Sequence, residues 1–169
     1  SYSTEVLSLI MQAYPDALLV ENEYGETPLT LALRLANTGR QIKLNSFMDI
    51  RNYVPSYECI KNNTPALYII EYMLSTRVRE DFIAALEKNL RDIVRNEDLL
   101  TLMISNEKGR ELIKRNISSV ILEVLAARDN PQEVFTSMLQ YEDLKASILS
   151  VDSPELKFNP LLLFIRFTM

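Results

Sequence analysis

Apolar residues recur along this chain at intervals of three and four positions, the spacing that places side chains on one face of an α-helix. One stripe consists of Val6, Leu9, Ile10 and Ala13. A second consists of Phe82, Ile83, Leu86, Leu90, Ile93 and Val94. The clearest consists of Leu112, Ile113, Ile117, Val120, Ile121, Val124 and Leu125. We interpret each stripe as the side of a helix that packs into a core.

Helix starts are indicated by a polar residue followed by proline, because proline fits the first helical position and the residue before it often caps. The pairs are Thr27-Pro28, Thr64-Pro65, Asn130-Pro131 and Asn159-Pro160. Stripes and pairs together predict helices near 4–14, 28–37, 65–75, 78–95, 97–105, 110–128, 131–141, 142–150 and 160–168. The stretch 38–63 contains Pro55 and mixed polarity, and its role stays open, with a short helix near 45–53 as one interpretation.

The chain has 169 residues and only three glycines, which favours one all-α domain over a sheet protein with many turns. We expect residues 1–169 to form a single helical domain. Because the first residue is serine rather than methionine, we also expect that this domain was cut from a longer protein.

Residues 21–33 read ENEYGETPLTLAL, and this segment resembles an ankyrin repeat, whose pattern is G-x-T-P-L-H-x-A. The matching residues are Gly25, Thr27, Pro28, Leu29 and Ala32, whereas Thr30 replaces the usual histidine. Weaker echoes begin at Ser105 (SNEKGRELI), Thr64 (TPALY) and Asn159 (NPLLLFIRFT). The resemblance implies an irregular stack of helical hairpins with insertions. The alternative fold is a helical bundle without repeats.

Composition argues against catalysis within this chain. It contains no histidine and a single cysteine, Cys59, which excludes Ser-His and Cys-His couples and a structural zinc site. Three scattered glycines cannot form a phosphate-binding loop. We therefore expect no enzyme activity, no cofactor and no metal. The missing disulfide favours a reducing, cytoplasmic (intracellular) location.

Charge and hydropathy limit the partners. The net charge of −5 makes nucleic acid a poor partner. No apolar run approaches the roughly 20 residues of a membrane span. Lys108, Arg110, Lys114 and Arg115 cluster in one stretch, either as a solvated helix face or as a contact for an acidic partner or phosphate. The apolar segment 159–169 predicts a docked helix, or a dimer contact with another chain.

The resemblance implies a non-catalytic module that binds another protein or another domain of its parent chain. The exposed finger of the repeat would supply the contact residues, which are Glu21, Asn22, Glu23, Tyr24 and Glu26. A plain solvated turn is the competing interpretation of these residues. The alternative function is a regulatory or substrate-recruiting helical region of a larger enzyme, whose catalytic residues lie outside the chain.

Overall fold

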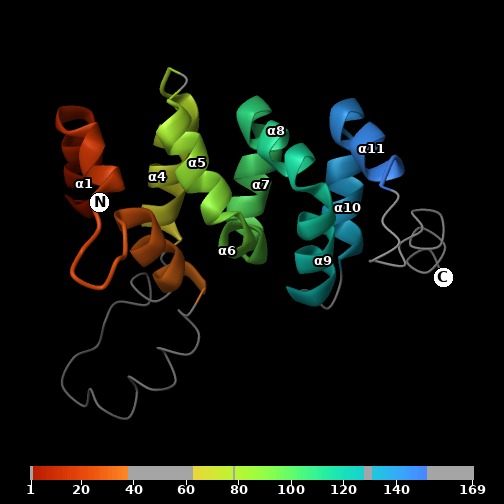
Figure 1. Ribbon diagram of the computed structural model, residues 1–169, viewed down its shortest axis with the longest axis horizontal. Coiled ribbons are helices and arrows are strands. Elements are labelled where there is room, and N and C mark those ends of the chain that lie inside the picture. Colours follow the sequence, from red (N-terminus) through yellow and green to blue (C-terminus); the bar gives the residue numbers. More distant parts are fainter. Residues whose placement is uncertain (1, 38–62, 78, 128–130, 152–169) are drawn as a thin grey trace, which may run out of the picture. The chain divides into compact units, whose positions relative to one another are not determined.

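The computed structural model describes residues 2–37, 63–77, 79–127 and 131–151, and every regular element within these ranges is helical (Figure 1). The elements are α1 (Tyr2–Ala13), the 3-10 helix η1 (Pro15–Leu19), a helical segment 28–37, α4 (Thr64–Ser75), α5 (Glu80–Lys88), α6 (Leu90–Arg95), α7 (Glu97–Ser105), α8 (Glu107–Arg115), α9 (Ile117–Ala127), α10 (Gln132–Leu139) and α11 (Glu142–Leu149). The all-α prediction is confirmed. None of the described helices has the length and apolar character needed to cross a membrane.

Two parts of the prediction concern residues outside these described ranges. The expected helix 160–168, with its cap Asn159 and the dimer contact, lies outside the described residues. The same holds for the ambiguous stretch 38–62 and for Cys59. The chain divides into two compact units, Ser1–Leu99 and Leu100–Met169, which are described separately.

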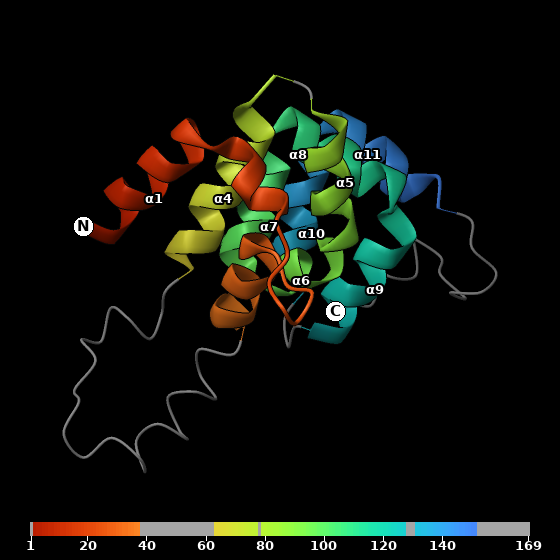
Figure 2. The same ribbon diagram turned by 60° about the vertical axis from the view of Figure 1, so that its left-hand side comes forward.

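In the first unit, α4 packs against both α1 and α5 (Figure 2). The buried residues of α4 are Ala66, Ile69, Ile70, Met73 and Leu74. On α5 and α6 they are Phe82, Leu86, Leu90, Ile93 and Val94, which confirms most of the second stripe as core. Burial of each large apolar side chain stabilises the fold by roughly 1.5–3 kcal/mol before ordering costs.

Arg79 connects η1 to the start of α5. Its Nη2 atom lies 2.8 Å from Asp16 and 2.7 Å from Asp81, and its guanidinium stacks 3.9 Å from the centre of the Phe82 ring. The hydrogen bonds to Asp81 and then Asp16 raise the pKa of Arg79 above its usual value. The hydrogen bond from Arg79 likewise lowers the pKa of Asp81. The Arg79 side chain thus links η1 to α5, the helix that packs against α4.

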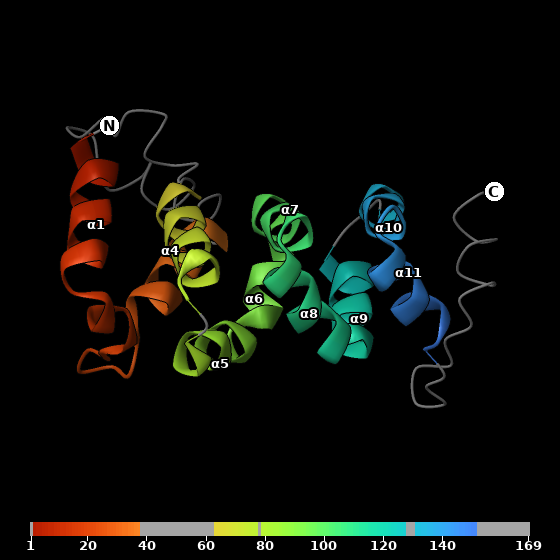
Figure 3. The same cartoon turned by 90° about the horizontal axis from the view of Figure 1, so that it is seen from above.

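In the second unit, α8 packs against α9 and α11, and α11 packs against α10 (Figure 3). The core residues of α8 and α9 are Leu112, Ile113, Val120, Ile121 and Val124, five of the seven in the clearest stripe. From α11, Leu144 and Ile148 complete this face. The predicted core stripe is therefore confirmed at these positions.

Two long predicted helices are wrong, because asparagine interrupts each of them. The segment 78–95 breaks at Asn89, whose Nδ2 donates to the Ala85 carbonyl at 2.8 Å. The segment 110–128 breaks at Asn116, whose Nδ2 donates to the Leu112 carbonyl at 3.0 Å. An amide side chain that bonds to the backbone competes with the helical hydrogen-bond ladder, so the helix can end without glycine or proline.

The proposed echo of residues 21–29 at residues 105–113 is also not a structural match. Gly25 lies in a turn with a φ angle of +74°, a left-handed conformation that favours glycine. Gly109 is instead buried within α8, where a Cβ atom would lie 2.2 Å from the Met103 carbonyl oxygen. The two glycines serve different purposes, a turn and a close helix contact.

The first apolar stripe is the clearest departure from expectation. Leu9 is 66% exposed and Ile10 is 52% exposed, while Val6 and Ala13 also face solvent. The side of α1 that is buried carries Met11. The interpretation of this stripe as core is wrong, because none of the described elements covers that side of α1.

Candidate functional site

The predicted finger is a tight turn whose backbone is fixed by Asn22. The Asn22 Oδ1 atom accepts hydrogen bonds from the backbone N–H groups of Tyr24 and Glu26, both at 2.9 Å. The backbone closes the same turn, since Asn22 donates to the Glu26 carbonyl at 2.9 Å and Gly25 donates to the Asn22 carbonyl at 3.0 Å. The turn follows α1 and η1 in the orange-red part of the chain (Figure 3). These four hydrogen bonds fix the shape of the turn.

The helix after the finger begins as the sequence predicts. Thr27 Oγ1 accepts a hydrogen bond from the Thr30 N–H at 3.3 Å, and Pro28 opens the helical segment 28–37. The Thr30 hydroxyl lies 3.0 Å from the Thr27 hydroxyl, at the position where the resembled pattern has histidine. Leu29 is fully buried. The finger is therefore anchored on both sides, by a capped helix and by η1.

The side chains of the five predicted contact residues divide into two groups. Tyr24 is 78% exposed, and Glu21 and Glu23 also face solvent. Neither of these two glutamates forms an ion pair with any residue in the described ranges. Asn22 uses its amide within the turn. The Glu26 side chain is only 18% exposed, and its carboxylate pairs with Arg34 of the following helix. Asn22 and Glu26 therefore stabilise the finger itself.

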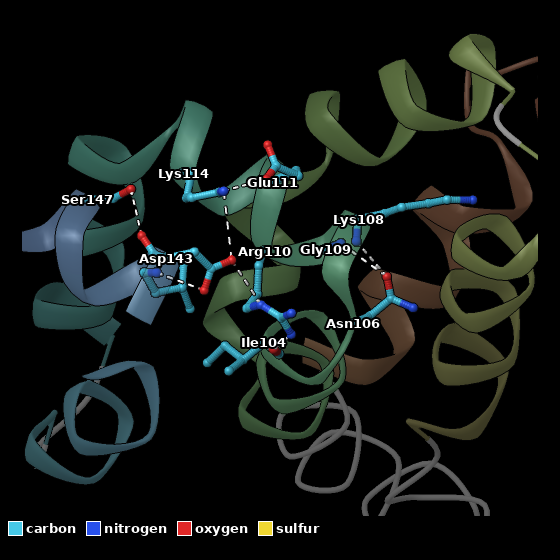
Figure 4. A network of polar contacts seen from close by, with 10 residues as sticks. Ile104, Asn106, Lys108, Gly109, Arg110, Glu111, Lys114, Asp143 and Ser147 are labelled. Atoms are coloured by element: carbon cyan, nitrogen blue, oxygen red, sulfur yellow. Dashed lines mark hydrogen bonds and ion pairs between the residues drawn. The ribbon is translucent and has the colours of Figure 1, made fainter. Parts of the chain in front are cut away.

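Two of the four residues in the predicted basic cluster, Arg110 and Lys114, are part of an internal network in the second unit (Figure 4). Arg110 Nε lies 3.2 Å from Asp143 Oδ2, its Nη1 donates to the Ile104 carbonyl at 3.0 Å, and its guanidinium lies 4.5 Å from the centre of the Tyr141 ring. Lys114 Nζ lies 3.7 Å from the same carboxylate oxygen and pairs also with Glu111. These cations hold α11 on α8.

Electrostatics agree with a structural role for Asp143. Partial burial by itself would raise the pKa of its carboxyl, but the hydrogen bond from Arg110 and the nearby charge of Lys114 lower it below the usual value. The pKa of Lys114 is raised, first by its hydrogen bond to Glu111. Each charge stabilises its neighbour in the charged form.

Within the described ranges, no group of histidine, cysteine or acidic side chains could hold a metal ion. No polar or charged residue in these ranges is buried. Ser105, which begins an S-x-x-K spacing, donates its hydroxyl to the Leu102 carbonyl at the end of α7.

No family model, no curated protein and no solved structure matches the chain.

Proposed function

We propose that this chain is a protein-binding module of ankyrin-like type and that the finger 21–26 is its contact site. The observation that carries the proposal is the contrast at Tyr24, whose backbone N–H is fixed by Asn22 while its side chain is 78% exposed. An aromatic side chain on a preformed turn offers a large contact area and little ordering cost on binding.

The ankyrin-like type is supported by the local geometry of the resembling segment. Gly25 makes the turn, Thr27 caps the next helix and Leu29 is buried beneath it. These are the tasks that the matching residues of the pattern would perform. This support covers residues 21–33 only. The glycine of the weaker echo at 105–113, Gly109, lies within a helix instead of a turn.

Charge defines the chemistry of the expected partner. Glu21 and Glu23 precede Tyr24 in the sequence and are exposed, and neither forms an ion pair with a described residue. A protein surface with lysine or arginine around an apolar depression would complement this arrangement. Glu26 is excluded from that contact by its ion pair with Arg34.

The test is photo-crosslinking in an extract of the source cells. A photoreactive phenylalanine at position 24 should give one dominant crosslinked protein, whereas the same group at Leu149, another strongly exposed position, should not. The unlabelled protein should compete for the product, and its Tyr24→Ala variant should compete poorly. Equal products from both positions, or equal competition by the variant, would refute the proposal.

A further inference from the structure

The outer side of α1 forms a second surface, independent of the finger. Val6, Leu9, Ile10 and Ala13 follow one another at helical spacing and are all exposed. Beside them, an open groove of about 470 Å³ runs between α1 and α4, lined by Glu5, Ser8, Leu9 and Tyr68. An exposed apolar stripe at helical spacing beside a groove offers a surface against which a second helix can pack its own apolar face.

Charge on this surface is one-sided. Glu5 lines the groove on α1, and Glu71 follows Tyr68 by three residues on α4, on the same side of that helix. Neither glutamate forms an ion pair within the described part of the chain. The sequences of α1 and α4 contain no lysine or arginine. The apolar stripe is thus bordered by uncompensated carboxylates.

The same molecule shows how such a stripe is covered. On α8, the apolar residues Leu112 and Ile113 lie beneath α11, which contributes Leu144 and Ile148. Charges of opposite sign then meet across the two helices, Arg110 and Lys114 from α8 with Asp143 from α11. α1 carries the apolar stripe and α1 and α4 carry the carboxylates, but the described elements supply neither the covering helix nor the cations.

We infer that the stripe on α1 is a docking site for an amphipathic helix of another protein, with lysine or arginine beside its apolar residues. Leu9 and Ile10 would anchor it, Tyr68 would contact its side, and Glu5 and Glu71 would pair with its cations. A second copy of this chain fits poorly, because pairing two α1 helices brings carboxylates and no cation to the contact. This inference does not rest on the finger.

The test uses the whole chain and two synthetic helical peptides of about 15 residues, each with leucine at i, i+3, i+4 and i+7. One carries lysine beside the leucines and the other carries glutamate. Fluorescence anisotropy should show that the lysine peptide binds at least about tenfold more tightly, and that the difference shrinks as salt rises from about 50 to 500 mM.

Variants at exposed positions locate the contact. Leu9→Glu should weaken binding of the lysine peptide by about tenfold or more, since it removes an apolar anchor. Leu149→Glu is the matched control, because it makes the same substitution at an exposed position of α11 and should leave binding nearly unchanged. Replacing Glu5 and Glu71 together by lysine should reverse the preference, so that the glutamate peptide becomes the tighter ligand.

Several results would overturn the inference. These are equal binding of the two peptides, equal loss in Leu9→Glu and Leu149→Glu, or a preference that survives the double lysine variant. A dimer in analytical ultracentrifugation that Leu9→Glu dissociates would assign the surface to a second copy. Binding of the chain to neutral phospholipid vesicles, abolished by Leu9→Glu, would assign it to a membrane. Tyr24→Ala should leave peptide binding unchanged. A failure of the docking site on α1 can therefore be distinguished from a failure of the proposed contact site at the finger.

Discussion

Two apolar stripes with the same helical spacing have opposite fates in this molecule. Leu112 on α8 is fully buried, whereas Leu9 on α1 is 66% exposed. α8 is covered by α11 and clamped by the pairing of Arg110 and Lys114 with Asp143, while no described element covers the outer side of α1. Periodicity therefore identifies the apolar face of a helix, and only the neighbouring elements decide whether that face is buried or exposed.

The largest difference is expected for the same substitution in the two stripes. Leu112→Ala should lower the free energy of unfolding of its unit by about 2–5 kcal/mol, because it leaves a cavity in a packed core. Leu9→Ala should change stability by less than about 0.5 kcal/mol, because the side chain is already in water. Guanidinium denaturation followed by circular dichroism measures both. Equal losses would mean that α1 is covered in solution.

A second difference concerns close packing on the buried side of α8. Gly109→Ala should destabilise the protein by about 1–3 kcal/mol, since its Cβ would meet the Met103 carbonyl and the helices would have to move apart. Ser8→Ala, on the open side of α1, is the control and should be nearly neutral. A thermal melt in which both variants match the parent would contradict the close approach of α7 and α8.

The asparagine cap of α8 should contribute less than the core. Asn106 Oδ1 accepts from the N–H groups of Lys108 and Gly109, at 2.9 and 3.2 Å. Asn106→Ala should therefore cost about 1 kcal/mol, and Asn106→Asp should retain most of the stability because aspartate caps equally well. Chemical denaturation of the three proteins measures this. Equal loss in both variants would show that capping is not what Asn106 contributes.

The smallest effect is expected from the charges that hold α11 on α8. The pKa of Asp143 is lowered in the folded state, so in mild acid the unfolded chain binds more protons than the folded chain. The free energy of unfolding therefore decreases as the pH is lowered through this range. This contribution is present above the ordinary aspartate pKa and is lost as pH falls through the lowered folded value. Asp143→Asn should remove that part of the acid dependence in melts at successive pH values. An unchanged pH profile would contradict the clamp.

Much of the helical fold could be predicted from local pattern. The cap at Thr27, the turn at Gly25 and the burial of Leu29 follow from residue chemistry that acts over a few positions. The breaks at Asn89 and Asn116 could not be predicted from glycine and proline, because there an amide side chain replaces them by bonding to the preceding turn.

The turn that carries the candidate site could be predicted from the sequence, but the contacts of its side chains could be predicted only in part. The exposed turn and Tyr24 were evident from the resemblance. The pairing of Glu26 with Arg34 spans eight residues and depends on how the helix leaves the turn, so composition does not indicate it. Whether the apolar side of α1 is exposed depends on the elements packed beside it. The stripe alone does not show whether another helix packs against that side.

The central claim is that Tyr24 serves binding and not folding. The measurement that tests it most directly combines, for Tyr24→Ala, the free energy of unfolding with competition for the product crosslinked at position 24. We predict stability within about 0.5 kcal/mol of the parent, as for other exposed positions, together with a competitor at least about tenfold weaker. A variant that is equally stable and competes as well as the parent would contradict the claim.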